Sequence, residues 1–204
     1  MLINIVTVIA SYLLGSMSFA VIISRAMHLP DPYQHGSGNP GATNVLRTGN
    51  KKAAVLTLLG DALKGAVAVL IAATLAEAFP ETSAYLVPVA ALAVFLGHLF
   101  PIFHRFRGGK GVATAAGIIF ALNWKLGLLL LAIWLIIAVG FKISSLAALV
   151  AALALLVSAF WLYGNSVLSW MFVIMVLLLI WWHKDNIARL RRGKEERIQK
   201  DTKP

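Results

Sequence analysis

The chain has 204 residues, of which 60% are hydrophobic and only 13% are charged, and its mean hydropathy is +0.84. This composition excludes an ordinary soluble domain and predicts an all-α integral membrane protein with several spans. The net charge of +10 lies in short loops and at the C-terminus, which favours membrane topology and anionic partners over nucleic acid, and the absence of cysteine excludes disulfides and thiolate chemistry.

The first predicted span covers residues 2–24. It has no positively charged n-region, and Arg25 follows it instead of a small-residue cleavage site. We therefore interpret it as a retained span rather than a signal peptide. Gly15, Ser16 and Ser18 give it a small-residue face against which another helix can pack closely.

The first polar loop, residues 25–52, contains the longest polar interval of the chain, HGSGNPGATNVLRTGNKK at residues 35–52. Its glycines allow tight turns that expose backbone N–H groups, and Arg47, Lys51 and Lys52 add positive charge, a combination that suits a phosphate. A flexible, positively charged loop on the inner side of a membrane would show the same residues, so both interpretations stay open at this point.

The second predicted span, residues 53–78, contains Asp61 and Lys64. Each ionisable group at the centre of a bilayer costs on the order of 2.5–3.5 kcal/mol, but a separation of three residues places these two on one helical face, where they can pair. A pair that locks helices together and a role at a functional site are both consistent with this pattern.

A short acidic turn at residues 77–81 is expected to face outward, and the third predicted span covers residues 84–103. His98 lies in this span. A single histidine on an apolar helix is typical of a packing residue, so we assign it no catalytic role.

The second polar loop, residues 104–114, reads HRFRGGKGVAT. Its glycines surround Lys110 and lead into a helix, an arrangement that directs N–H groups and a positive charge at an anion. The G-x-x-x-x-G-K-[ST] spacing of a nucleotide-binding loop is absent, and a membrane helix precedes the loop instead of a strand, which excludes nucleoside triphosphate binding.

The apolar stretch at residues 112–122 decides the topology. It is only about 16 Å long as a helix, so it is either a short span or part of one long helix over residues 112–140. The merged helix would place Lys142 and the basic tail outside, against the positive-inside rule. We therefore predict seven transmembrane helices, one of them short, with the N-terminus outside and the C-terminus cytoplasmic.

The last two predicted spans cover residues 144–163 and 167–182. Their ends carry aromatic residues that we interpret as interface anchors rather than substrate-stacking groups: Trp161, Tyr163, Trp170, Trp181 and Trp182.

The third polar segment, residues 183–196, begins with His183, and Asn186 follows three residues later on the same helical face. A flexible basic tail is predicted over residues 197–204. In the seven-span topology the third polar segment and both polar loops lie on the inner face, where they offer phosphate-binding groups and one residue that titrates near neutral pH. They offer no convincing metal-ligand spacing. Because this face borders hydrocarbon, one substrate could keep an acyl chain in the bilayer while its charged end lies in the loops.

Three motifs resemble those of a known family: GSGNPGATNVLR (residues 36–47), FRGGKGVAT (106–114) and HKDNIARLRRGKE (183–195) are similar to the cytoplasmic motifs of the bacterial PlsY family, the membrane acyl-phosphate:glycerol-3-phosphate acyltransferases. The resemblance covers the whole chain, residues 1–204, as one polytopic domain. It implies transfer of a fatty acyl group from acyl phosphate, not acyl-CoA, to the 1-hydroxyl of glycerol 3-phosphate. The products are lysophosphatidic acid and inorganic phosphate, in the first step of phospholipid synthesis.

The resemblance also implies a location in the bacterial inner membrane with the active site on the cytoplasmic face, and no cofactor or metal. The residues it implies as catalytic are Ser37, Arg47, His183 and Asn186. Those implied as substrate-binding are Gly38, Asn39, Gly41, Thr43, Asn44, Lys64, Gly108, Gly109, Lys110, Gly111, Thr114 and Ser145. Asp61 and Glu195 are expected to be structural supports.

The mechanism that we expect is direct attack of the glycerol hydroxyl on the acyl carbonyl, because a phosphate leaving group makes an acyl-enzyme unnecessary. His183 or a substrate phosphate oxygen could accept the hydroxyl proton, and the sequence does not separate them. Two other functions fit parts of the pattern: a transporter of phosphorylated metabolites, although no inverted repeat is evident, and a noncatalytic lipid-binding protein.

Overall fold

In the computed structural model of the protein, residues 1–79 and 85–198 are described, and within these ranges every regular element is a helix. The chain divides into two compact units, Met1–Leu122 and Asn123–Pro204, which are considered separately below. The predicted acidic turn lies largely outside the described residues, as does all but the first part of the predicted tail, and the prediction of a single domain stays a prediction.

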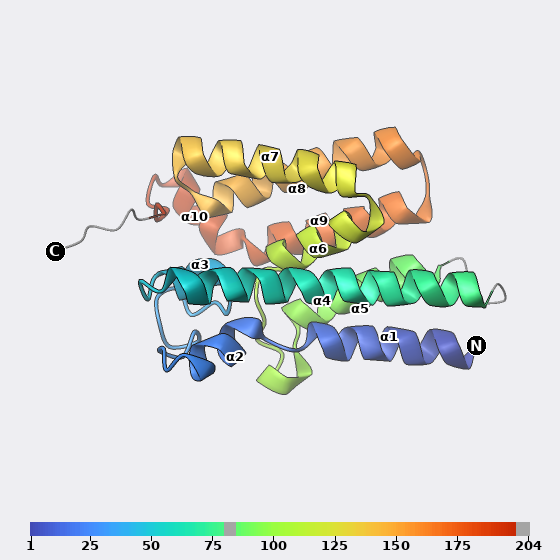
Figure 1. Cartoon of the computed structure of the whole chain (residues 1–204). Coiled ribbons are helices and arrows are strands. Elements are labelled where there is room, and N and C mark those ends of the chain that lie inside the picture. Colours follow the sequence, from blue (N-terminus) through green and yellow to red (C-terminus); the bar gives the residue numbers. More distant parts are fainter. Residues whose placement is uncertain (80–84, 199–204) are drawn as a thin grey trace. The chain divides into compact units, whose positions relative to one another are not determined.

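The first unit is built around its longest helix, α4, which packs against every other α-helix of this unit (Figure 1). A methyl group on Gly65 or Gly117 would overlap backbone atoms of the opposite helix, so α4 and α6 are in direct backbone contact. The elements of this unit are α1 (Leu2–Gly15), α2 (Phe19–Ala26), α3 (Ala42–Leu46), α4 (Lys51–Ala78), α5 (Leu86–Leu99), the 3₁₀ helix η1 (Ile102–His104) and α6 (Val112–Leu122).

The first predicted span is not continuous, which corrects the expectation of one helix over residues 2–24. The chain bends by 45° between α1 and α2. The hydroxyl of Ser16 donates to the carbonyl of Tyr12, four residues earlier, at 2.9 Å, and such back-bonding favours a bend. The small-residue face is confirmed, because a methyl group on Gly15 would overlap the backbone of Val94 in α5.

Helices α4 and α5 differ from their predicted bounds at the ends that carry the polar loops. Helix α4 starts two residues early because the side chain of Asn50 caps it by accepting from the N–H of Ala53 at 2.9 Å. Helix α5 ends at Leu99, four residues early, and Pro101 then leads into η1.

The second unit contains α7 (Trp124–Phe141), α8 (Ser144–Tyr163), α9 (Val167–Trp182) and α10 (Lys184–Arg191), with α8 packed against both α7 and α9. Asn123 separates α6 from α7, as predicted, and caps α7 by accepting from the N–H of Leu126 at 3.1 Å. This cap starts α7 at Trp124. Helices α9 and α10 meet at a bend of 59°.

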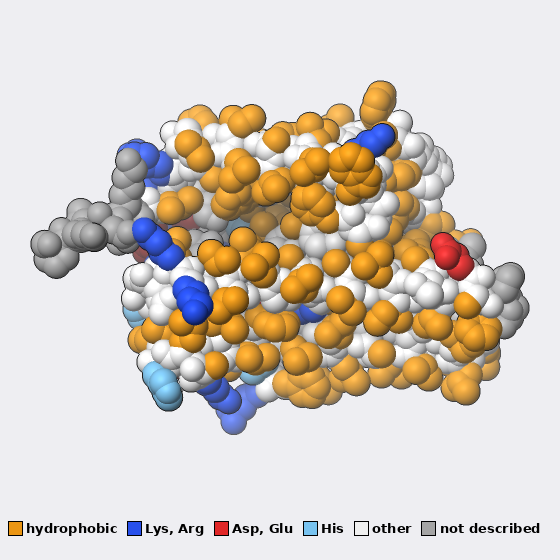
Figure 2. Space-filling model, viewed as in Figure 1, with side chains coloured by type: hydrophobic (Ala, Val, Ile, Leu, Met, Phe, Trp, Pro, Cys, Tyr) orange, Lys and Arg blue, Asp and Glu red, His pale blue; other side chains and the backbone are white. Residues whose placement is uncertain are grey.

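Among the described residues, four helices are long and apolar enough to cross a membrane, and the number rises to six if each bent pair counts as one span. The bent pairs are α1 with α2 and α9 with α10, and α6 is a shorter apolar helix. Apolar side chains cover much of the visible surface along the helices (Figure 2). The chain is thus a multi-pass membrane protein by its helices, while the seventh span and the orientation stay predictions.

Candidate functional site

Asn44 in α3 organises the first polar loop. Its side chain is buried, and its amide nitrogen donates to the carbonyls of Pro32 at 2.9 Å and His35 at 3.0 Å. Its amide oxygen accepts from the N–H of Ser37 at 2.9 Å. The three hydrogen bonds of Asn44, a residue predicted to bind substrate, therefore stabilise the fold of the loop. They also hold Ser37 in an exposed turn.

Arg47 lies beside the same turn. Gly36 has a φ of +57°, and a methyl group there would overlap the Asn44 oxygen and lie 3.0 Å from Cδ of Arg47. A glycine at position 36 thus lets the arginine side chain lie against the backbone next to Ser37. The structure places both predicted catalytic residues of the first polar loop, Ser37 and Arg47, at one exposed position.

The remaining predicted residues of this loop differ in exposure. Thr43 and Gly38 are exposed, Asn39 is half-buried, and Gly41 is the N-cap of α3.

The second polar loop folds over the end of α5. The N–H of Gly109 donates to the carbonyl of His98 at 3.2 Å, and a methyl group on Gly109 would overlap the imidazole of His98 and lie 2.9 Å from the carbonyl oxygen of Pro40. The hydroxyl of Tyr33 also donates to the carbonyl of Arg107 at 2.7 Å. The two polar loops therefore meet at the end of α5.

Other predicted residues of the second polar loop lie at different depths. Gly108 and Lys110 are half-buried, and Gly111 is buried beside the ring of Phe95. Thr114 is fully buried where α6 contacts α4, and its hydroxyl has no hydrogen-bond partner among the described residues.

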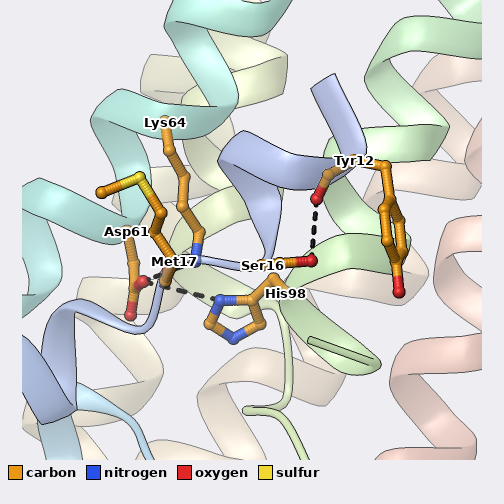
Figure 3. Close-up of polar contacts among 6 residues, drawn as sticks. All are labelled: Tyr12, Ser16, Met17, Asp61, Lys64 and His98. Carbon is orange, nitrogen blue, oxygen red and sulfur yellow. Dashed lines mark hydrogen bonds and ion pairs between the residues drawn. The ribbon is translucent and has the colours of Figure 1, made fainter. Parts of the chain in front are cut away.

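A buried polar junction lies beneath the two loops (Figure 3). Nζ of Lys64 is 2.9 Å from Oδ1 of Asp61, so the predicted pairing is confirmed, and the same ammonium donates to the carbonyl of Met17 at 2.7 Å. Nδ1 of His98 lies 3.5 Å from Oδ1 of Asp61, a distance at which a protonated imidazole forms an ion pair. All three side chains are at most 6% exposed.

His98 lies at this junction, although the sequence assigns it no role beyond packing. One edge of its ring faces Asp61 and the other faces Gly109 of the second polar loop. The available signal was its position: it lies at the end of a span, a few residues before a glycine-rich basic loop.

The junction borders a narrow gap that is too small to hold a water molecule. Lys64 and His98 line it together with Pro40 from the first polar loop and Gly108 and Gly109 from the second. Polar groups of both loops are therefore packed closely around the junction. The other lining residues are Gly15, Ser16, Met17, Ser18 and Pro101.

His183 in the second unit stands at the corner between α9 and α10. It is buried, and its Nδ1 lies 2.8 Å from the carbonyl of Leu179. A carbonyl only accepts, so this contact assigns the Nδ1 proton to the neutral imidazole and leaves the lone pair on Nε2.

Glu195 joins α8 to α10. One carboxylate oxygen accepts from the hydroxyl of Ser145 at 2.7 Å and from the amide of Asn186, and the other accepts from Nε of Arg189 at 2.7 Å. Burial acts to raise the pKa of Glu195, but these bonds and the Arg189 charge outweigh it, so the pKa lies below its usual value. Glu195 thus supports the predicted catalytic residue Asn186, and the hydroxyl of Ser145 is bound to the carboxylate.

Each unit gathers its own share of the predicted site. The first unit brings Ser37, Arg47, both glycine-containing loops and the Asp61–Lys64 pair together, and the second brings His183, Asn186, Ser145 and Glu195 together. The predicted meeting of all three polar segments involves both units and stays a prediction. In the part of the chain that the structure describes, no three His, Asp or Glu side chains are grouped to hold a metal ion.

Comparison with known proteins gives consistent matches over almost the whole chain. A family profile described as glycerol-3-phosphate acyltransferase matches residues 5–193. Glycerol-3-phosphate acyltransferases of Cupriavidus necator and Ralstonia pickettii are 57% and 58% identical, over 195 and 197 residues. Each alignment covers 96% of this chain, with 96% of the first relative and 94% of the second.

Two solved structures are similar in fold as well. Both are crystal structures of PlsY (YgiH), an integral membrane glycerol 3-phosphate acyltransferase, one in its glycerol 3-phosphate form and one in its lysophosphatidic acid form. The first has a TM-score of 0.88 at 37% identity and covers 96% of both chains. The second has a TM-score of 0.85 at 36% identity and covers 95% of this chain and 94% of the other.

Proposed function

The chain belongs to the glycerol-3-phosphate acyltransferase family, and on this premise we propose that it transfers a fatty acyl group from acyl phosphate to the 1-hydroxyl of glycerol 3-phosphate. The products are lysophosphatidic acid and inorganic phosphate, which begins phospholipid synthesis. The glycerol 3-phosphate and lysophosphatidic acid forms of the solved relatives support the acceptor and the product. The acyl phosphate donor is the part that rests on the motifs.

One observation carries this proposal: the first and second polar loops meet at His98, with Ser37 and Arg47 exposed at the surface of the first loop. Two loops with glycines and basic residues form a surface suited to phosphate groups, and both substrates carry one. The apolar helices beside the loops give the acyl chain an environment in the bilayer.

The chemistry that fits these residues is direct attack of the glycerol hydroxyl on the acyl carbonyl. Ser37 binds a phosphate or the developing oxyanion, and Arg47 and Lys110 neutralise phosphate charge. Glu195 fixes the amide of Asn186, which orients a substrate. Nε2 of His183 accepts the hydroxyl proton or binds phosphate, and a substrate phosphate oxygen is the alternative base.

The topology that fits this chemistry has seven spans: α1 with α2, then α4, α5, α6, α7, α8 and α9. The N-terminus is outside and the C-terminus is cytoplasmic in a bacterial inner membrane. Within the first unit, the starts of α4 and α6 and the ends of α2 and α5 all border basic loops, which supports one cytoplasmic end.

Acyl transfer by the purified protein in detergent tests the proposal, with labelled glycerol 3-phosphate and either palmitoyl phosphate or palmitoyl-CoA. We expect lysophosphatidic acid from palmitoyl phosphate only. The product should be lost in Ser37→Ala and His183→Ala and kept in Ser158→Ala, a control within α8. If the folded wild type forms no product from either donor, the proposal is wrong. Uptake of glycerol 3-phosphate into proteoliposomes without conversion would then indicate a transporter, and anionic-lipid binding without turnover a noncatalytic lipid-binding protein.

Direct attack has its own test. Mass spectrometry of the protein mixed with acyl phosphate alone should show no acylated Ser37. Detection of an acyl group on that residue would replace the direct route with a covalent one.

A further inference from the structure

A short turn at residues 102–107, called the 102–107 turn below, presents apolar and basic side chains together. Ile102, Phe103 and Phe106 are 48%, 61% and 57% exposed, and Arg105 and Arg107 between and beside them are exposed as well. The turn begins in the last three residues of a candidate span, Leu86–His104, and continues beyond it, so it lies at the boundary of the membrane. In Figure 1, η1 projects from the first unit beside α1 and α2.

Hydrogen bonds keep the 102–107 turn in one conformation. The N–H groups of His104 and Phe106 both donate to the carbonyl of Pro101 at 3.0 Å, and the N–H of Arg107 donates to the carbonyl of His104 at 3.1 Å. The Tyr33 hydroxyl holds the carbonyl of Arg107 from outside. The exposed side chains are therefore carried by an ordered backbone rather than by a flexible loop.

The backbone of this turn is also strained. Arg105 and Phe106 have φ angles of +52° and +60°, so two consecutive non-glycine residues occupy the left-handed region. Neither residue type relieves this strain as glycine or asparagine would. Strain of this kind persists where a fixed side-chain arrangement serves a function. Here it places the exposed Phe106 between the exposed Arg105 and Arg107.

We propose that the 102–107 turn is a binding site for an anionic phospholipid of the surrounding bilayer. The apolar side chains of the turn enter the acyl-chain boundary, and Arg105 and Arg107 bind the phosphate of the headgroup. Guanidinium groups pair with phosphate in a bidentate manner, and aromatic side chains are favoured at this depth of a membrane.

The alternatives explain less of the turn. An acidic protein partner would use the arginines but would leave three apolar side chains without a contact. Basic residues that serve topology alone need neither the aromatic side chains nor two left-handed residues. The proposal concerns binding to the bilayer and does not rest on the proposed acyl transfer.

The absence of cysteine from the chain allows a direct test with one fluorophore. Phe103→Cys is labelled with an environment-sensitive dye and reconstituted into nanodiscs of phosphatidylcholine with phosphatidylglycerol, and either lipid carries a nitroxide. We expect nitroxide phosphatidylglycerol to quench the label at position 103 more strongly than nitroxide phosphatidylcholine. The excess should decrease with added salt.

The matched control is Ile136→Cys, an exposed position on α7, where both nitroxide lipids should quench equally. Arg105→Gln and Arg107→Gln in the labelled protein should each lower the preference for the anionic lipid by about fivefold. Thermal unfolding of each variant reports whether it is folded. If one of the two variants does not fold, the other alone tests the proposal. Equal quenching by both lipids at position 103, or a preference that survives both substitutions, would overturn the proposal.

Discussion

The two units each bury a carboxylate, and they stabilise it differently. Asp61 lies within a span and pairs with Lys64 of the same helix, whereas Glu195 lies beyond the last candidate span and collects donors from α8 and α10. A carboxylate that enters a bilayer without a partner is costly. A lysine three residues away on the same helix avoids this cost, because it is in reach as soon as the helix forms. A carboxylate at the membrane surface stays hydrated until its distant partners assemble around it.

The largest expected effect tests the pair within the span. Lys64→Met leaves Asp61 buried without its cation, and we expect the free energy of unfolding in detergent to fall by about 3–5 kcal/mol. The double variant Asp61→Asn/Lys64→Met removes both charges and should recover most of this loss.

Activity of the double variant then decides between the two roles of the pair. Full acyl transfer would make the pair a lock between helices, and a folded but inactive protein would place it in the site. If the double variant is as unstable as Lys64→Met, the charge pairing is not what stabilises this junction.

The corresponding change in the second unit is Glu195→Gln. It removes the negative charge and so weakens all three hydrogen bonds that the carboxylate accepts. We expect a loss of about 1.5–3 kcal/mol, with faster hydrogen exchange in α10 and unchanged exchange in α4. Glu77→Gln, at an exposed position near the end of α4, is the control and should change stability by less than about 0.5 kcal/mol. Equal protection of α10 in both variants would contradict the role of Glu195.

Gly109→Ala tests whether the loops depend on the buried junction. The new methyl group would overlap the His98 ring, so we expect a loss of about 1–3 kcal/mol and a raised KM for glycerol 3-phosphate. Gly140→Ala is a matched control, because a methyl group there has no heavy atom within 4 Å and a helical alanine is favoured. Wild-type kinetics for Gly109→Ala would show that the loop moves away from His98 at no cost.

The low pKa of Glu195 predicts a dependence on acid. The folded protein favours the carboxylate, so its stabilisation is complete above the ordinary pKa of 4.5 and is lost as the pH falls through the lower folded value. Below about pH 4.5, the thermal unfolding temperature should therefore fall more steeply with decreasing pH for the wild type than for Glu195→Gln. Parallel curves would show that this carboxylate contributes nothing.

Tyr33 should give the smallest effect. Burial, and the charge of Asp31 in addition, raise the pKa of Tyr33 from 10.0 to about 12, so the neutral phenol is favoured in the fold. Its stabilisation is present below pH 10 and is lost between pH 10 and about 12. Tyr33→Phe should lose about 0.5–1.5 kcal/mol and remove the latest phenolate transition from the absorbance titration; a titration that keeps it would assign the raised pKa elsewhere.

Local patterns predicted much of the fold. Apolar length and positive-inside charge gave the separate helices on either side of Asn123, and the spacing of three residues gave the Asp61–Lys64 pair. The bend between α1 and α2 was missed because serines in an apolar stretch are equally typical of a straight helix with a small-residue face. The carbonyl of Met17 at the bend accepts a hydrogen bond from Lys64 on another helix, and a local pattern does not contain that contact.

The contacts of the candidate site were not predictable from the motifs. The motifs predict Ser37, Arg47, His183 and Asn186 as catalytic, which stays a prediction, and they did not indicate that Asn44 folds its own loop. Ser145 and Glu195 are separated by 50 residues, and no periodicity links them. His98 was missed for the same reason, since its partners lie on α4 and in the second polar loop.

The bend in the first span has a consequence for biogenesis. The carbonyl of Met17 receives its hydrogen bond from Lys64, 47 residues later in the chain, so this bond forms only after the second span has left the ribosome. The two segments are therefore expected to leave the translocon as a hairpin. In lipid, the first span supplies the Met17 carbonyl as an acceptor for the Lys64 ammonium, and the second span supplies that ammonium as a donor for the carbonyl.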